Sequence, residues 1–416
     1  MRVSGIIVEY NPFHNGHNYH LKKTKDITGS QYIIAIMSGN FLQRGEPALF
    51  NKWIRTKMAL YAGVDIVIEL PVVYSCQSAE FFAYGAIQLL DQLGVVNNIV
   101  FGCEEYDINK LKSVSDILAE EPIPYKNFLK RELKKGKSFP SARAEALEKY
   151  FLNNVNNSIS NDIKTIIQSP NNILGIEYLK WLKIFNSSII PKIITRKGPG
   201  YHSKVIDKNY SSATAIRNQI FSNNENINNL KGFLPDSSNL IIKEALKENY
   251  IPAHFEYLSK SIFSILLRDD SISLKEYLDI SEGLDRRLLN YLATNSIEEF
   301  INLVKTKRYT YTRIQRILSH ILLDIKVDDL NMFKENGGVQ YIRILGFSEK
   351  GKNILSELKK KSQLPIITNL SKSYKLLNPV QRKMINYDIR ATNIHTLHFS
   401  KNYKKNLDFS SSPIIV

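Results

Sequence analysis

Short apolar runs recur along the first half of the chain, and each is followed by a stretch with helical periodicity. The apolar runs predict five strands, at 3–8, 32–37, 64–70, 98–102 and 188–195. The stretches between them predict helices at 17–27, 47–62, 77–93 and 171–184. Strands that alternate with helices are typical of an α/β fold with a parallel, doubly wound, Rossmann-like sheet.

Proline and serine mark the expected starts of two of these helices. Pro47 opens the second helix, and Pro170 opens the helix before the fifth strand, with Ser169 as a cap. The first helical turn tolerates proline because its N–H groups lack intrahelical acceptors.

From about residue 235 the short apolar runs that predict strands no longer recur, and helical periodicity dominates. The segments 239–249, 254–268, 284–293, 296–305 and 311–326 fit helices, and only "LPIITN" at 364–369 resembles a strand. We therefore expect an α/β domain over 1–220 with a charged helical insertion at about 106–165. A linker over 221–234, which includes "FSNNENINN", then leads to a mainly α-helical region over 235–416.

Composition narrows the class of protein. The chain has 416 residues, 43% of them hydrophobic, and no apolar run approaches the ~20 residues that span a bilayer. It opens on a strand-like segment rather than on a signal peptide. Cys76 and Cys103 are the two cysteines, so we expect buried thiols and a reducing, cytoplasmic location.

The positive charge is concentrated near the C-terminus. Residues 1–304 hold 35 Lys and Arg against 32 Asp and Glu, whereas residues 305–416 hold 21 against 8. A surplus of thirteen in the last quarter of the chain favours a polyanionic partner such as RNA. A lysine-rich composition that only solvates the surface is the alternative.

Three histidines crowd around one glycine in "EYNPFHNGHNYH", directly after the first predicted strand. His14 and His17 fall at the expected start of a helix, where free backbone N–H groups and the helix dipole attract anions. Gly16 lets a nucleotide approach closely. A zinc site with His20 and a purely structural cluster remain alternatives, although no Asp or Cys accompanies the histidines.

"HNGH" resembles the HxGH motif of the nucleotidylyltransferase superfamily, and "SSATAIR" at 211–217 resembles its second motif, ISSTxxR. The strings "VEYNPFHNGH", "MSGNFLQRGEPA", "GVDIVIELP" and "KTKRYTYTRIQR" narrow the resemblance to the family of bacterial tRNA(Met) cytidine acetate ligases. The resemblance covers nearly the whole chain. It identifies 1–220 as the ATP-binding catalytic domain and 235–416 as a tRNA-binding region.

The resemblance implies a two-step ligation. ATP and acetate would give acetyl-adenylate and pyrophosphate, and the 4-amino group of the wobble cytidine in elongator tRNA(Met) would then take the acetyl group. Cationic donors, and Mg²⁺ with the triphosphate, would stabilise charge on the leaving pyrophosphate. No protein metal site and no enzyme nucleophile is expected.

The resemblance also implies which residues act. His14 and His17 would be catalytic, on the phosphates of ATP. The nucleotide would be held by Ile7, Val8, Glu9, Tyr10, Asn11, Pro12, Phe13, His14, Asn15, Gly16, His17, Asn18, Tyr19, His20, Gly102, Asn171 and Arg196. Gly102 could instead be only a turn, Asn172 could exchange roles with Asn171, and Arg196 could be a surface cation.

Other polar residues follow or lie within the second and third predicted strands. Asn40, Gln43 and Arg44 follow the second strand and are expected to line the nucleotide cleft, whereas Asp65 and Glu69 are either structural or metal or amine contacts.

The basic stretch at 305–316 is expected to contact RNA through its cations, with Tyr309 and Tyr311 stacking on unpaired bases. The cations are Lys305, Lys307, Arg308, Arg313 and Arg316. An amphipathic helix with a solvated basic face is the alternative.

Two other functions remain open from the residues alone. One is an adenylyltransferase for a small phosphorylated cofactor precursor, and the other is a non-catalytic RNA-binding protein switched by a nucleotide. The basic C-terminal region argues against the first, and the intact "HNGH" argues against the second. The sequence leaves the oligomeric state open.

Overall fold

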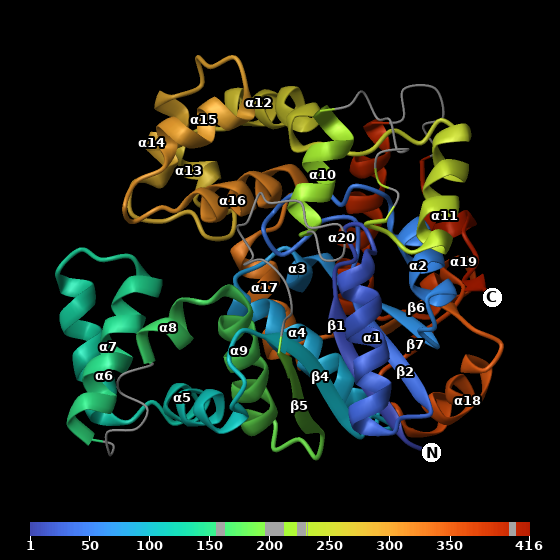
Figure 1. The fold of residues 1–416 in the computed structure, drawn as a ribbon. Helices are drawn as coiled ribbons and strands as arrows, with labels where there is room; N and C mark the ends of the chain where they lie inside the picture. The colour runs from blue at the N-terminus through green and yellow to red at the C-terminus, as the bar shows by residue number, and fades with distance from the viewer. Residues whose placement is uncertain (155–162, 196–211, 223–229, 231, 399–404) are drawn as a thin grey trace.

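The computed structural model describes residues 1–154, 163–195, 212–222, 230, 232–398 and 405–416. Within these ranges eight strands form one sheet in the order β5-β4-β1-β2-β3-β6-β7, with β8 paired to β6 (Figure 1). The strands are β1 Val3–Val8, β2 Tyr32–Ser38, β3 Ile66–Leu70, β4 Asn98–Cys103, β5 Ile190–Thr195, β6 Ile342–Phe347, β7 Ile366–Ile367 and β8 Ile414–Ile415.

The first five strands confirm the doubly wound prediction. β1 pairs in parallel with both β2 and β4, β2 with β3, and β4 with β5. The chain therefore moves outward from β1 to β3, then returns to the other side of β1 for β4 and β5. This reversal places a topological switch point between β1 and β4, where open α/β sheets bind ligands.

Alternating strand residues supply two hydrophobic cores, one on each face of the sheet. In β2, Ile34 and Ile36 point into one core, and Ile33, Ala35 and Met37 point into the other. Helices α4 and α9 pack on the first face, and α1 and α2 on the second. Cys76 and Cys103 are both buried free thiols, as expected.

The helices follow the predicted order. In the first half of the chain they are α1 Asn15–Thr28, α2 Lys52–Tyr61, α3 Val72–Ser75, α4 Ala79–Gln92, α5 Ile108–Glu120, α6 Ile123–Lys134, α7 Phe139–Asn154, α8 Ile163–Gln168, α9 Pro170–Ile184 and α10 Ala213–Ser222. The second half holds α11 Asp236–Lys247, α12 Ser259–Arg268, α13 Ser271–Leu274, α14 Leu284–Asn290, α15 Ile297–Val304, α16 Tyr311–Leu323, α17 Val327–Glu335, α18 Gly351–Lys361, α19 Leu370–Ser373, α20 Pro379–His395 and α21 Leu407–Ser410. None of the helices in the described ranges is both long and apolar enough to cross a bilayer.

The second helix begins later than Pro47 suggested. α2 starts after Asn51, whose side chain accepts a hydrogen bond from the N–H of Ile54. Pro47 instead lies in a loop, opposite Phe41 in an isolated β-bridge. The side-chain cap, rather than the proline, therefore sets the start of the helix.

The region after residue 235 contains three strands, β6, β7 and β8, as well as helices. The expectation that strands end at about residue 235, apart from one possible strand at 364–369, is therefore wrong. β7 lies inside the one segment that resembled a strand, whereas β6 and β8 were not predicted. β6 pairs antiparallel with β3, so the C-terminal region extends the sheet of the N-terminal region. β6 is almost fully buried and therefore lacks the polar-apolar alternation that marks a half-exposed strand.

The expected domain boundaries at residues 220 and 235 stay a prediction.

A buried cluster of four charged side chains joins the two regions of the chain. Lys52 Nζ lies 2.7 Å from Glu69 Oε1 and 2.7 Å from Asp408 Oδ1. Arg343, on β6, contacts the same Asp408 Oδ1 at 2.7 Å. Burial acts to raise the pKa of Asp408, but Lys52 and Arg343 hold it below its ordinary value. Glu69 is thus structural, one of the two roles considered for it.

We expect Asp408→Asn to destabilise the whole chain. The isosteric change leaves Lys52 and Arg343 with one carboxylate between them, and breaking a buried ion pair costs about 3–5 kcal/mol. Denaturant unfolding of the full chain measures this loss. Glu244→Gln is the matched control, because its pair with Lys57 is exposed and should contribute little. Similar unfolding midpoints for the two variants would contradict the structural role of the cluster.

Candidate active site

A pocket of about 600 Å³ opens at the carboxyl ends of β1, β2 and β4. Its walls come from the loop after β1, the loop after β2, the end of β4, and the first turns of α1, α7, α9 and α10. The start of α16, from the C-terminal region, closes another side. The pocket therefore lies at the predicted switch point.

Two histidines cap the N-terminus of α1 reciprocally. His14 is the N-cap residue, and its Nδ1 accepts a hydrogen bond from the N–H of Gly16 at 3.0 Å. The Nδ1 of His17 accepts a hydrogen bond from the N–H of His14 at 3.3 Å. The two rings stack with centroids 3.8 Å apart. Imidazoles thus fill the roles that Ser and Glu play in an ordinary capping box.

These contacts fix the tautomer of both rings. An Nδ1 atom that accepts a hydrogen bond carries no proton, so a neutral ring is protonated at Nε2. Each ring is then a hydrogen-bond donor beside the positive end of the α1 dipole. Within the described ranges no three His, Cys, Asp or Glu side chains are grouped to hold a metal ion. The geometry favours anion binding over the zinc alternative.

Gly16 also makes room for the capping ring of His14, a role that the sequence alone does not show. A Cβ atom at this position would lie 2.8 Å from Cε1 of His14 and 3.0 Å from its Nδ1. Any side chain would therefore displace the capping ring. The glycine makes room for His14 as well as for a ligand.

Arg55 of α2 holds the loops that form the floor of the pocket. Its fully buried guanidinium donates to the carbonyls of Glu9 at 2.6 Å, Ser38 at 3.0 Å and Gly39. Burial lowers the pKa of Arg55 to about 10. Because these carbonyls end β1 and β2, one side chain fixes both loops.

Glu9 places a carboxyl group inside the pocket. Its Oε1 accepts a hydrogen bond from the N–H of Gln43 at 2.8 Å. Burial raises the pKa of Glu9 above its ordinary value, partly offset by that hydrogen bond. Glu9 is thus more basic than an exposed glutamate.

Most of the residues expected to hold the nucleotide line this pocket. They are Ile7, Val8, Glu9, Tyr10, Asn11, His14, Gly16, His17, Tyr19, His20, Gly102 and Asn171. Pro12, Phe13, Asn15 and Asn18 do not line it. Phe13 is a core residue, and Asn15 binds the carbonyl of Gly232. Arg196 lies outside the described residues.

The structure distinguishes Asn171 from Asn172. Asn172 is buried, and its Oδ1 accepts hydrogen bonds from the N–H groups of Glu104 at 2.9 Å and Glu105 at 3.0 Å. Asn171 lines the pocket, and its Nδ2 donates to Glu104 Oε1 at 2.6 Å. Asn172 therefore shapes the turn after β4, while Asn171 faces the ligand space.

Several lining residues were not proposed as site residues. Arg217, in the quoted second motif, donates to the carbonyl of Asn11 at 3.1 Å and to Glu46 Oε1 at 3.0 Å. Phe139 and Arg143 come from the helical insertion. The second motif could have identified Arg217 as a site residue, whereas no local sequence pattern marks Phe139 or Arg143. Asp65, considered for the cleft, accepts from the N–H of Ile33 and is structural.

The basic stretch divides into an outer and an inner part. Lys305, Lys307 and Arg308 are exposed, whereas Arg316 faces into the pocket. Arg313 donates to the carbonyl of Asp279 at 3.1 Å.

One tyrosine of this stretch does not fit its expected role. Tyr309 is buried, and its hydroxyl donates to the carbonyl of Glu282 at 3.1 Å, so base stacking by Tyr309 is wrong. Tyr311 remains partly exposed.

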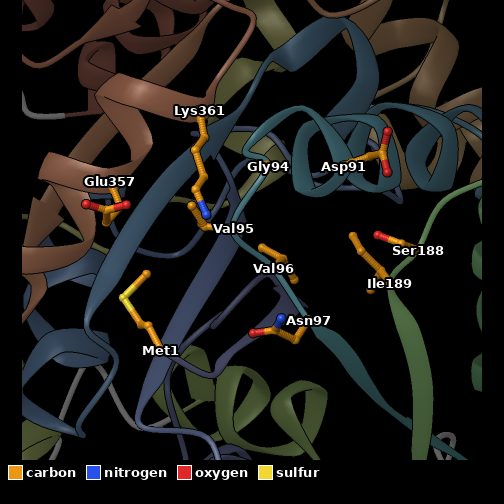
Figure 2. A pocket seen from close by; sticks show the side chains of 10 residues that line it. All are labelled: Met1, Asp91, Gly94, Val95, Val96, Asn97, Ser188, Ile189, Glu357 and Lys361. Atoms are coloured by element: carbon orange, nitrogen blue, oxygen red, sulfur yellow. The ribbon is translucent and has the colours of Figure 1, made fainter.

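A second hollow, of about 400 Å³, lies at the opposite edge of the sheet (Figure 2). Met1, Asn97 and Ile189 line it just before β1, β4 and β5 begin, with Lys361 and Glu357 beside them. Ligands of doubly wound sheets bind beyond the carboxyl ends of the strands, so we assign no site here.

Stacked imidazole donors at a helix terminus, in a switch-point pocket, suit the phosphates of a nucleotide. A nucleotidyl transferase is the class of protein that this geometry defines. Residues 1–409 match the family model described as HIGH Nucleotidyl Transferase.

Curated relatives define the class more closely. A tRNA(Met) cytidine acetate ligase of Thermoanaerobacter sp. (strain X514) is 48% identical over 98% of both chains. The enzyme of that name from Clostridium perfringens (strain ATCC 13124) is 44% identical over the full length of both. This chain belongs to the tRNA(Met) cytidine acetate ligase family.

Solved structures agree with this assignment. Thermotoga maritima TmcAL in its apo form has a TM-score of 0.95 and 38% identity, with both chains covered completely. The same protein bound with alpha-thio ATP has a TM-score of 0.93 and 39% identity. The two alternative functions, a cofactor adenylyltransferase and a non-catalytic RNA-binding switch, are therefore set aside.

We expect Asn171→Ala and Asn172→Ala to separate ligand binding from stability. Asn171→Ala removes a side chain that lines the pocket, so the Kd for ATP should rise while the unfolding temperature stays the same. Asn172→Ala leaves two backbone N–H groups of a buried turn unpaired, which costs about 1–3 kcal/mol. Calorimetric titration and thermal unfolding measure both. ATP binding unaffected by Asn171→Ala would remove Asn171 from the site.

Proposed function

We propose that the enzyme activates acetate with ATP and transfers the acetyl group to the 4-amino group of the wobble cytidine of elongator tRNA(Met). The observation that carries this proposal is the reciprocal cap of His14 and His17 inside the switch-point pocket. The names of the relatives, tRNA(Met) cytidine acetate ligases, support the choice of acyl group and acceptor.

In the first step a carboxylate oxygen of acetate attacks the α-phosphorus of ATP. A new O–P bond forms, the bond from the α-phosphorus to the bridging oxygen breaks, and pyrophosphate leaves with its electron pair. Negative charge grows on the leaving group, so fixed donors at that position lower the barrier. The Nε2–H groups of His14 and His17, with the N-terminus of α1, are the donors proposed for it.

The adenosine half of ATP is proposed to lie toward β4 and α9. Gly102 and Asn171 line that part of the pocket, beside Phe101 and Tyr178. Gly102 has no side chain to obstruct the nucleoside. Arg196, which lies outside the described residues, is kept as a nucleotide contact from the family resemblance alone.

In the second step the 4-amino nitrogen of cytidine attacks the acetyl carbonyl carbon. An amide bond forms, the bond from the carbonyl to the adenylate oxygen breaks, and AMP leaves. The nitrogen must lose one proton, and a carboxylate with a raised pKa is a suitable acceptor. We assign that role to Glu9, which lies in the pocket and whose pKa is raised by burial.

Mg²⁺ is proposed to arrive with the triphosphate of ATP. Magnesium usually keeps several waters and is held by substrate phosphates with only one or two carboxylates. Glu46 lines the pocket and suits such limited contact. When bound, Mg²⁺ would neutralise charge on the phosphates.

tRNA is proposed to bind over the exposed cations that precede α16. Lys305, Lys307 and Arg308 are exposed there, next to the pocket wall formed by Thr310 and Thr312. Cations at this position would guide the anticodon backbone toward the pocket. Because tRNA is the proposed substrate, we propose a cytoplasmic location.

We expect His17→Ala to slow adenylate formation by about 10²–10³-fold, the usual cost of removing a donor from developing charge. The assay is carboxylate-dependent exchange of labelled pyrophosphate into ATP without tRNA. His254→Ala is the control, because His254 is an exposed cap of another helical turn, outside the pocket lining. A folded His17→Ala enzyme with a normal exchange rate would exclude His17 from the mechanism.

A further inference from the structure

Arg316 is a half-buried cation that the proposed reaction has not yet used. It lies on α16, in the C-terminal region, and its side chain lines the pocket of His14 and His17. Its guanidinium makes no hydrogen bond or ion pair with any described residue, and its Nε atom is buried. A buried donor without a partner is costly, and this one belongs to a cation that faces a pocket, so the position suggests an anionic ligand.

The position of Arg316 relative to the pocket is fixed by the loop after β2. Ser319 of α16 donates a hydrogen bond to the carbonyl of Gly45. Gly45 has a φ of 89°, and a Cβ there would lie 2.6 Å from the backbone nitrogen of Arg316. Glycine is thus required for the loop to touch the helix, and that contact holds Arg316 beside Gln43 and Arg44.

The charges around Arg316 also favour an anion. Burial lowers the pKa of its guanidinium, Asp279 opposes this effect, and the nearby cations Arg313 and Arg44 add to it. Asp279 acts on Arg316 through its charge but forms no hydrogen bond with the buried Nε atom. An incoming carboxylate or phosphate would relieve the repulsion between these cations.

The topology of the sheet divides the pocket into two halves. β1 lies between β4 and β2, so the N-terminus of α1, which follows β1, stands at the middle. The nucleotide half, toward β4 and α9, contains Gly102 and Asn171. The acceptor half, toward β2 and α16, is lined by Gln43, Arg44, Thr310, Thr312 and Arg316.

We propose that Arg316 binds the carboxylate of the acyl donor in the acceptor half of the pocket, an inference that rests on the ligase reaction proposed above. The phosphates have their own donors in His14, His17 and the terminus of α1. The carboxylate must attack the α-phosphorus in line, opposite the leaving pyrophosphate. Arg316 lines the part of the pocket that is assigned neither to adenosine nor to the histidine donors of the pyrophosphate. Its planar guanidinium can hold a carboxylate through two parallel hydrogen bonds.

This assignment replaces the expectation that Arg316 contacts RNA with the rest of the basic stretch. Arg316 and the exposed Lys307 and Arg308 are close in sequence but face different spaces. The helix that follows the proposed RNA contacts would then also hold the acyl donor.

The test measures pyrophosphate exchange into ATP without tRNA, with acetate and ATP varied separately. For Arg316→Gln we expect the KM for acetate to rise about 10- to 100-fold, the range for a lost charge-assisted hydrogen bond. The KM for ATP should stay within about twofold of wild type, since ATP keeps its own donors. The unfolding temperature should not fall, because the buried Nε atom of Arg316 has no hydrogen-bond partner to lose.

Two further variants make the result specific. Arg316→Lys keeps the charge but loses the planar fork, so its KM for acetate should lie between those of wild type and Arg316→Gln. Arg390→Gln is the matched control, because Arg390 donates to the carbonyl of Leu323 at the far end of α16. It should leave the KM for acetate unchanged.

Other outcomes would overturn the assignment. A higher KM for ATP with an unchanged KM for acetate would make Arg316 a phosphate contact. Normal exchange with a defect only in tRNA-dependent acetylation would make it an RNA contact. Wild-type enzyme that shows no carboxylate-dependent exchange would instead refute the proposed function itself.

Discussion

The buried charges on one face of α2 constrain the rest of the structure. Lys52 lies between Glu69 and Asp408, and Arg343 lies against the same two carboxylates. Each of these charges is buried away from water, so the loss of an oppositely charged partner would strongly destabilise the fold. The cluster therefore ties the N-terminal sheet to the C-terminal strand β6. One turn later on α2, Arg55 uses that rigid helix to fix the carbonyls that end β1 and β2.

This joining has a consequence for the pocket. The C-terminal region is attached through β6 on the sheet and through α20, whose Asp388 accepts from the N–H of Val72 and whose His395 contacts the carbonyl of Ala48. α16 lies on the same region and rests on the loop after β2. The pocket is thus completed by residues more than 250 positions after the HNGH loop. Nucleotide chemistry and the proposed RNA contacts are physically connected rather than carried by two independent modules.

The features that local sequence patterns determine could be predicted from the sequence. The five parallel strands were predictable because buried strands and amphipathic helices alternate, and the HNGH loop because helix termini bind anions. The start of α2 was misplaced because proline is permitted in a first turn, whereas the cap by Asn51 decides where the helix begins. β6 was missed because Arg343 interrupts its apolar run, and no local pattern shows that this charge is buried against Asp408.

Some functional residues could likewise be predicted from the sequence, whereas the roles of others could not. His14 and His17 could be located from their spacing, but their reciprocal cap and the packing of Gly16 against His14 depend on the three-dimensional structure. Asn171 and Asn172 are neighbours with opposite roles, and only their partners distinguish them. Arg316 was grouped with the cations beside it in sequence, because no sequence pattern shows that α16 turns its side chain inward.

The central claim is that this single pocket joins a carboxylate to the α-phosphate of ATP. The most direct measurement uses acetate labelled with ¹⁸O in both carboxylate oxygens, with ATP and tRNA, and determines where the label goes. Attack on the α-phosphorus predicts one ¹⁸O atom in the AMP produced, with unlabelled pyrophosphate. Label in inorganic phosphate together with ADP would instead indicate an acyl phosphate and would contradict the account.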